Sequence, residues 1–160
     1  MIRKNLLLLF ILFCVSAMAD NLPKRINLSG KWLFTLDRQH TVQPNDKLKE
    51  TVELPGTTDT NMKGDIVNKY DETTHLTRRY SYRGRAWYQH EIEIPADWKG
   101  MSVYLFLERT KPSEVYVDGK LMGSSNDIST PQVYNLSSAL TTGSHNLSIM
   151  VDNGSGVPEQ

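Results

Sequence analysis

The strongest constraint on the fold is a β-hairpin signature, K-P-S-E-V-Y-V-D-G-K-L-M-G, at Lys111–Gly123. Val115 and Val117 alternate with more polar neighbours, which is the period of a half-buried strand. Asp118-Gly119 follows directly, and this pair favours the positive φ angles of a tight two-residue hairpin turn. A return strand comes next, and Gly123 is expected to end it. The stretch therefore predicts a short antiparallel hairpin.

Longer alternating runs lie on either side of the hairpin, at Met101–Glu108 and His145–Asp152. Similar runs occur earlier, at Asn27–Leu36 and Arg85–Ile94, and no segment has the pattern of a helix of ordinary length. Met101–Glu108 is apolar on both faces, which predicts a central strand rather than an edge. The chain is therefore predicted to be an all-β antiparallel sandwich.

The first nineteen residues have the features of a signal peptide. Basic residues precede a short apolar run at Leu6–Val15, and Ala17-Met18-Ala19 is the small-x-small pattern of a cleavage site. The apolar run is shorter than the roughly 20 residues that a membrane-spanning helix needs. We therefore expect cleavage after Ala19, export to the periplasm or the extracellular space, and one domain at residues 20–160.

The composition of the mature chain excludes several classes of partner. Removal of Arg3 and Lys4 leaves 16 basic and 18 acidic residues, a net charge of −2. This interspersed, nearly neutral surface favours neither nucleic acid nor a membrane as a partner. Cys14 is the sole cysteine and lies within the signal peptide, so the domain has no disulfide and depends on packing for its stability.

The connection Thr57–Gly84 has no sustained periodicity. A connection of this length in a compact domain indicates either that strands within it have been missed or that it is a functional loop. Tyr80 and Tyr82 can stack on a pyranose ring, while Arg78 and Arg79 can hydrogen-bond its hydroxyl groups. The alternative is that the tyrosines close one end of the sandwich. The sequence leaves both interpretations open.

No catalytic constellation is found in the sequence. There is no G-x-S-x-G elbow, cysteine nucleophile or glycine-rich phosphate loop. Glu91 and Glu93 share one strand face and are expected to be solvated, and Asp71-Glu72 lies in the long connection without a feature that raises a carboxyl pKa. No pair of histidines has metal-ligand spacing among His40, His75, His90 and His145. We predict no catalytic residue, no metal and no cofactor.

Six short motifs occur in order along most of the mature chain. They are L-S-G-K-W-L-F at Leu28–Phe34, L-P-G-T at Leu54–Thr57, G-R-A-W-Y at Gly84–Tyr88, V-Y-V-D-G-K-L-M-G at Val115–Gly123, P-Q-V-Y-N-L at Pro131–Leu136 and V-D-N at Val151–Asn153. Together they resemble the N-terminal sugar-binding domain of glycoside hydrolase family 2, which contains β-galactosidases, β-mannosidases and β-glucuronidases.

The resemblance implies a jelly-roll sandwich of the galactose-binding-domain type, truncated before its last strand. It further implies a downstream immunoglobulin-like domain and a (β/α)₈ barrel, whose two glutamates perform retaining hydrolysis of β-glycosides. Neither glutamate can be placed in this chain. The long connection is expected to lean toward the barrel, with Asn61 and Asp65 near its start. Together with Arg79 and Tyr82, they are the candidate substrate-binding residues.

Three functions compete at this point. The first is a non-catalytic carbohydrate-binding or scaffold domain of an exported family 2 β-glycosidase. The second is a free-standing secreted carbohydrate-binding module that uses the tyrosine and arginine residues of the long connection. The third is a small autonomous enzyme, against which the lack of a catalytic constellation argues.

Overall fold

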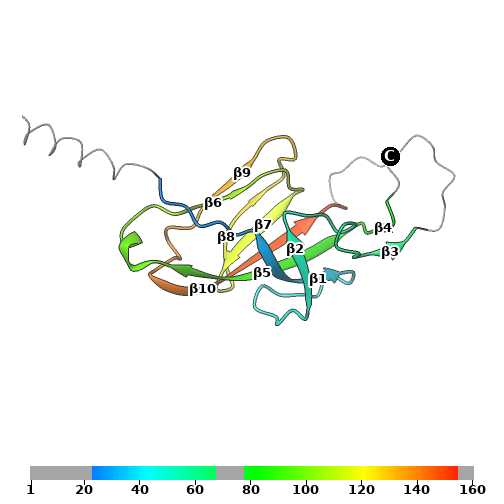
Figure 1. Cartoon of the computed structure of the whole chain (residues 1–160), viewed down its shortest axis with the longest axis horizontal. Coiled ribbons are helices and arrows are strands. Elements are labelled where there is room, and N and C mark those ends of the chain that lie inside the picture. Colours follow the sequence, from blue (N-terminus) through cyan, green and yellow to red (C-terminus); the bar gives the residue numbers. More distant parts are fainter. Residues whose placement is uncertain (1–22, 68–77, 155–160) are drawn as a thin grey trace, which may run out of the picture.

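The computed structural model describes residues 23–67 and 78–154, which fold as an antiparallel β-sandwich (Figure 1). The predicted signal peptide at residues 1–19 lies outside the described residues, as do Asp71-Glu72 and His75. In the described part of the chain, no helix is long and apolar enough to cross a membrane. The strands are β1 (Gly30–Asp37), β2 (Glu50–Leu54), β3 (Asp65–Ile66), β4 (Tyr80–Ser81), β5 (Arg85–Ile94), β6 (Tyr104–Leu107), β7 (Ser113–Val117), β8 (Lys120–Ser125), β9 (Gln132–Asn135) and β10 (Gly143–Asp152).

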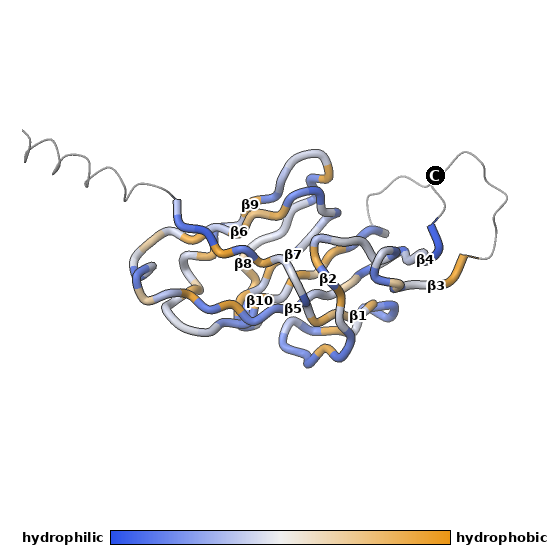
Figure 2. Tube along the Cα trace, in the orientation of Figure 1, coloured by the Kyte–Doolittle hydropathy of each residue, from blue (hydrophilic) through white to orange (hydrophobic). Residues whose placement is uncertain are grey.

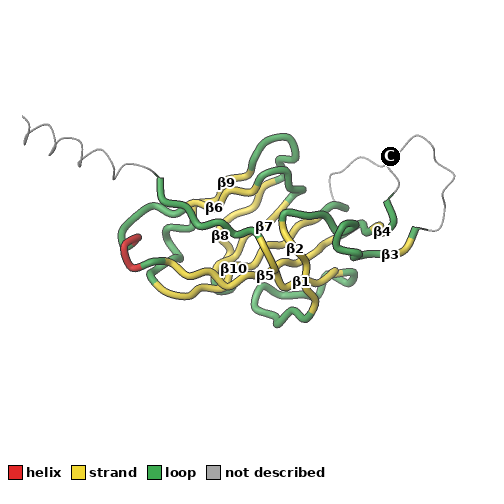
Figure 3. Tube along the Cα trace, viewed as in Figure 1, coloured by secondary structure: helices red, strands yellow, loops and turns green. Residues whose placement is uncertain are grey.

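The larger layer is a six-stranded sheet in the order β2-β1-β5-β10-β7-β8. The 10-residue strands β5 and β10 pair along their whole length in its centre, with Gly143 opposite Ile94 and Asp152 opposite Arg85. Hydrophobic and hydrophilic residues are interspersed through the sandwich (Figure 2), and hydropathy alternates clearly in the second half of β5, at Glu91–Ile94. One short 3₁₀ turn, η2 (Ala96–Trp98), is drawn as helix among the described strands and loops (Figure 3).

The smaller layer is the pair β6-β9, and β9 also contacts β8 at the edge of the larger sheet. The main core lies between the layers. Phe34, Val115 and Leu147 of the larger sheet are fully enclosed there, and Leu105 and Tyr134 cover them from the smaller one. Because alternate residues of each strand point to the same face, the sequence pattern identifies most of this core.

The predicted hairpin is confirmed, with one error at its end. Asp118 and Gly119 both have positive φ angles, 49° and 81°, as a two-residue hairpin turn requires. The return strand does not stop at Gly123 but continues to Ser125, because Ser124 and Ser125 pair with Glu114 and Ser113 beyond a β-bulge in the β7–β8 register. A side chain at Gly123 would lie 3.1 Å from the ring of Tyr134. This glycine therefore makes room for the ring and does not end the strand.

The prediction of a central strand at Met101–Glu108 is wrong. Its ordered part, β6, pairs only with β9 among the described strands, so it is an edge. Leu105 points into the core, but Tyr104 and Phe106 on the opposite face are 57% and 60% exposed. A strand that is apolar on both faces is usually covered on both, and this one carries uncovered aromatic side chains instead.

The connection between β1 and β2 packs against the outer face of the six-stranded sheet. Leu48 is buried there against Trp87 and Met150, forming a second small core. The Gln89 side chain and the Ser148 hydroxyl donate hydrogen bonds of 3.0 and 2.7 Å to a backbone carbonyl of the connection. The residues of the connection, Arg38–Lys49, are mostly polar, which by itself predicts a surface connection. In the structure this connection covers the apolar side chains on the outer face of β5 and β10.

Candidate functional site

The start of the long connection is held by Asn61, one of the four candidate substrate-binding residues. Its side-chain oxygen accepts the Glu53 N–H at 2.7 Å, and its amide nitrogen donates to the carbonyls of Glu53 and Thr57 at 3.1 and 3.0 Å. A side chain at Gly56 would lie 2.5 Å from the Glu53 carbonyl oxygen, which explains the glycine of the L-P-G-T motif. The Asn61 amide thus shapes the turn after β2.

Asp59 ties the two ends of the connection together. Its Oδ1 atom accepts the backbone N–H groups of Arg79 and Tyr80 at 3.0 and 2.7 Å. β3 and β4 pair beside this contact, and the Val67 N–H donates to the Arg79 carbonyl at 3.0 Å. The small two-stranded sheet projects from one end of the sandwich (Figure 1). Asp59 is a structural residue that the sequence analysis did not single out.

Asp65 and Tyr82 are brought together by Arg38, which the sequence analysis also missed. The Arg38 guanidinium donates to both carboxylate oxygens of Asp65 at 3.1 and 2.9 Å, and it lies 5.2 Å from the centre of the Tyr82 ring. The Tyr82 ring is buried and its hydroxyl donates to the Arg85 carbonyl at 2.7 Å. Burial raises the pKa of Tyr82, and the nearby Arg38 charge partly opposes this shift.

Asn153 closes the same end of the sandwich from the far end of the chain. Its side-chain oxygen accepts the Gly84 N–H at 2.7 Å, and its amide nitrogen donates to the Tyr82 carbonyl at 2.8 Å. The Asn153 backbone N–H also donates to the Gly84 carbonyl at 3.2 Å. The V-D-N and G-R-A-W-Y motifs are therefore two halves of one contact.

The four candidate residues lie along one connection at one end of the sandwich, and the polar atoms of three of them bond to other groups of the chain. Asn61 and Tyr82 bond to backbone groups, and Asp65 bonds to Arg38. Arg79 differs, because its side chain is exposed and its guanidinium lies 5.9 Å from the centre of the Tyr80 ring. Tyr82 thus closes the end of the sandwich, and Arg79 presents its charge to solvent.

Comparisons with known proteins agree with this architecture. No family model matches the chain. A curated β-glucuronidase from Formosa agariphila is 25% identical over 138 residues, which are 81% of this chain and 14% of that protein. A β-D-glucuronidase structure from Dictyoglomus thermophilum is 26% identical with a TM-score of 0.56, over 82% of this chain and 21% of that one. The chain resembles family 2 β-glucuronidases.

Two further structures show the same fold. The β-glucuronidase of Faecalibacterium prausnitzii matches 82% of this chain and 22% of its own, with 21% identity and a TM-score of 0.62. The Ruminococcus gnavus β-glucuronidase gives 17% identity and a TM-score of 0.61 over 82% of this chain and 23% of its own. The chain thus spans less than a quarter of each relative, and the resemblance predicted from its motifs is confirmed.

Two of the titratable side chains that the sequence analysis named, Glu91 and His145, make structural contacts in the sandwich. Glu91 and Glu93 are exposed as expected, and Glu91 accepts a hydrogen bond of 2.6 Å from the Ser144 hydroxyl. His145 is buried, with Nδ1 2.7 Å from an Asp118 carboxylate oxygen and Nε2 3.0 Å from the Thr141 carbonyl. The hydrogen bond with Asp118 raises the pKa of His145. Within residues 23–67 and 78–154, no three acidic, histidine or cysteine side chains are grouped as a metal site would require.

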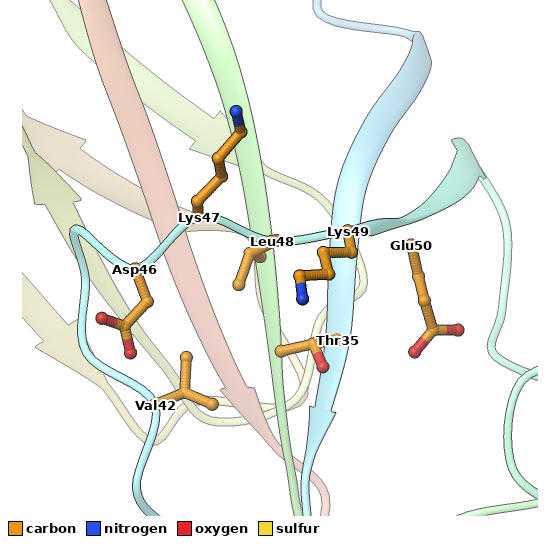
Figure 4. A pocket seen from close by; sticks show the side chains of 7 residues that line it. All are labelled: Thr35, Val42, Asp46, Lys47, Leu48, Lys49 and Glu50. Carbon is orange, nitrogen blue, oxygen red and sulfur yellow. The ribbon is translucent and has the colours of Figure 1, made fainter.

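A shallow hollow of about 600 Å³ lies beside the β1–β2 connection (Figure 4). Its lining is Thr35, Val42, Asp46, Lys47, Leu48, Lys49 and Glu50. In Figure 4 the Lys47 side chain extends away from the others, so the charged groups do not converge on one point. A small-molecule site has a few polar groups that converge within an apolar pocket, and this hollow lacks that arrangement.

Proposed function

We propose that this β-sandwich is the non-catalytic carbohydrate-binding or scaffold domain of an exported family 2 β-glycosidase. The main support for the proposal is that the chain is much shorter than the relatives that it matches. About four-fifths of the chain matches β-glucuronidases, yet the match covers only 14% to 23% of those proteins. In this proposal the hydrolytic groups and the downstream domains belong to polypeptide outside the chain.

The hydrogen bonds that the long connection makes within the chain favour a scaffold over an autonomous sugar site. Asn61 bonds to backbone groups of the adjoining turn, while Asp59 and Asn153 bond to backbone groups 20 and 69 residues away, so together they fix the shape of one end of the sandwich. A fixed surface of this kind suits the wall of a pocket that is completed by another domain. Arg79 has an exposed guanidinium that can hydrogen-bond a sugar.

The proposal is tested with the chain alone and an aryl β-D-glucuronide as substrate. We expect no hydrolysis above the rate in buffer, and turnover by the purified chain would disprove the non-catalytic role. Isothermal titration calorimetry with glucuronic acid separates the two remaining functions. We expect no binding, or a dissociation constant above about 1 mM. Micromolar affinity lost in Arg79→Ala would instead establish a free-standing carbohydrate-binding module.

Export is a separate part of the proposal and rests on the pattern of residues 1–19. Fusion of this segment to alkaline phosphatase, which is active only after export, tests it directly in a bacterial host. We expect activity in the fusion and none when charged residues interrupt the apolar run Leu6–Val15. An inactive but well-expressed parent fusion would overturn this part and leave the domain assignment intact.

A further inference from the structure

Two loops of the sandwich are joined by the buried side chain of Gln132, in the P-Q-V-Y-N-L motif. One loop, residues 108–112, leads from β6 to β7, and the other, residues 126–131, leads from β8 to β9. The Gln132 amide nitrogen donates to the Lys111 carbonyl at 3.2 Å and to the Asp127 carbonyl at 2.5 Å. Because Gln132 is only 3% exposed, this contact is shielded from water. One buried amide therefore fixes the spacing of the two loops.

Each loop is also fixed internally. The Asp127 carboxylate accepts the backbone N–H groups of Ser129 and Thr130 at 2.8 and 3.0 Å. In the facing loop, Arg109 has a φ angle of 55°, a left-handed conformation that residues other than glycine rarely adopt. Backbone strain of this kind is concentrated at binding sites and other functional positions. The surface between the loops is thus shaped by contacts within the chain.

A cleft of about 260 Å³ lies between residues 108–111 and 128–131. Glu108, Arg109 and Lys111 line it and are exposed. Their side chains make no hydrogen bond or ion pair with another residue in the described part of the chain. The cleft therefore offers two cationic donors and one carboxylate acceptor whose bonding capacity is unused within residues 23–67 and 78–154.

The charges of the cleft select the class of ligand. An anion attracted by Arg109 and Lys111 would be repelled by Glu108 in the same lining and by the carboxylate that holds the facing loop. A neutral ligand rich in hydroxyl groups can accept from the cations and also donate to Glu108, and such charge-assisted hydrogen bonds are strong. Ile128 and Pro131 supply apolar lining for the C–H face of a pyranose ring.

We propose that this cleft is a subsite for one neutral pyranose unit of a β-glycoside. The inference rests on the proposed carbohydrate role of the domain and places a sugar contact outside the long connection. The Asp152 N–H donates to the Pro112 carbonyl at 2.9 Å, directly beside the contact between Asn153 and Gly84. The cleft and the long connection therefore lie at the same end of the sandwich. The volume of the cleft is below the range of drug-sized ligands and suits a single sugar ring, which predicts millimolar affinity.

Nuclear magnetic resonance of the ¹⁵N-labelled chain tests the proposal with methyl β-D-glucopyranoside as the probe. We expect saturable chemical-shift changes at the amides of Thr110, Lys111 and Ser129, with a dissociation constant between about 1 and 30 mM. Sodium sulfate is the anion probe and should cause no saturable change at the same ionic strength. The subsite would be refuted if shifts were absent up to about 100 mM glucoside. Shifts confined to residues 78–82, or produced by sulfate alone, would refute it as well.

Substitutions of exposed residues sharpen the test. Lys111→Ala should raise the dissociation constant by about fivefold or more, since a hydrogen bond to a charged group is lost. Lys120→Ala is the matched control, because it removes the same charge from an exposed position at the other end of β7, and it should change the constant by less than about twofold. Glu108→Gln should also weaken binding of the glucoside, and tighter binding would overturn the assignment of a neutral ligand.

The outcomes separate this inference from the proposed function. Hydrolysis of an aryl glucuronide by the chain would disprove the non-catalytic role whether or not the cleft binds a sugar. Lack of binding in the cleft would refute the subsite and leave the scaffold role intact. Equal weakening by Lys111→Ala and Lys120→Ala would show that the glucoside does not bind between the two loops.

Discussion

The contact between Asn153 and the start of β5 gives a quantitative test of how the sandwich end is held. In Asn153→Ala, two side-chain hydrogen bonds are lost, one from the Gly84 N–H and one to the Tyr82 carbonyl. Each such bond contributes about 1 kcal/mol net. The free energy of unfolding should therefore fall by about 2 kcal/mol. This is a large share of the 5–15 kcal/mol typical of a domain.

Urea denaturation measures this change. With a slope of about 2 kcal/mol per molar urea, the unfolding midpoint should fall by about 1 M at an unchanged slope. Asn153→Asp keeps the acceptor for the Gly84 N–H but loses the donor to the Tyr82 carbonyl. Its unfolding midpoint should therefore fall about half as far as that of Asn153→Ala. Asn146→Ala is the matched control, because the Asn146 side chain makes only a 3.4 Å bond to the Ser148 hydroxyl.

The reasoning would be refuted by a midpoint for Asn153→Ala within about 0.25 M of the unmodified chain, which corresponds to about 0.5 kcal/mol. It would equally be refuted if Asn146→Ala lowered the midpoint as much as Asn153→Ala. A reduced slope would point to a changed unfolded state or to loss of two-state behaviour, which circular dichroism and fluorescence should then report as separate transitions.

Further predictions concern the core, the histidine contact and the long connection. Phe34→Ala should lower the free energy of unfolding by about 3–5 kcal/mol, while Leu33→Ala on the exposed face of the same strand should change it by less than about 1. Asp118 raises the pKa of His145, so the protonated histidine stabilises the fold. This stabilisation is complete below the unfolded-state pKa of about 6.5, and it is lost as pH rises through the raised pKa of the folded state. His145→Gln should thus destabilise the chain more at pH 5.5 than at pH 8.5, measured by urea titration. Asp59→Ala should speed hydrogen exchange at its two backbone donors and leave exchange in β10 unchanged.

Local sequence signals predicted the larger part of the fold. Alternation identified the faces of β1, β5, β7 and β10, because every second residue of a strand meets the core whatever the topology. The Asp118-Gly119 turn was predictable because its backbone angles depend on two adjacent residues. The family resemblance followed from short motifs in order, several of which are turns or strand ends with specific backbone requirements.

The errors and omissions concern interactions that are distant along the chain. Whether β6 has a neighbour on each side depends on the layer around it and not on its own apolar pattern. Asp59 bonds to a backbone group 21 residues away, and Asn153 to one 69 residues away. An aspartate or asparagine in a loop carries no local sign of its partner. The candidate residues Asn61, Asp65, Arg79 and Tyr82 were thus named without their contacts, and their role in substrate binding stays a prediction.

The Asn153 contact also fixes the direction in which the described chain leaves the sandwich. Gly154 lies directly against Gly84, with a site for an added Cβ atom 3.2 Å from the Gly84 backbone, and its N–H donates to the Asp152 side chain at 2.7 Å. As far as Gly154, the described chain is therefore held against the start of β5, beside the Tyr82 carbonyl that Asn153 contacts.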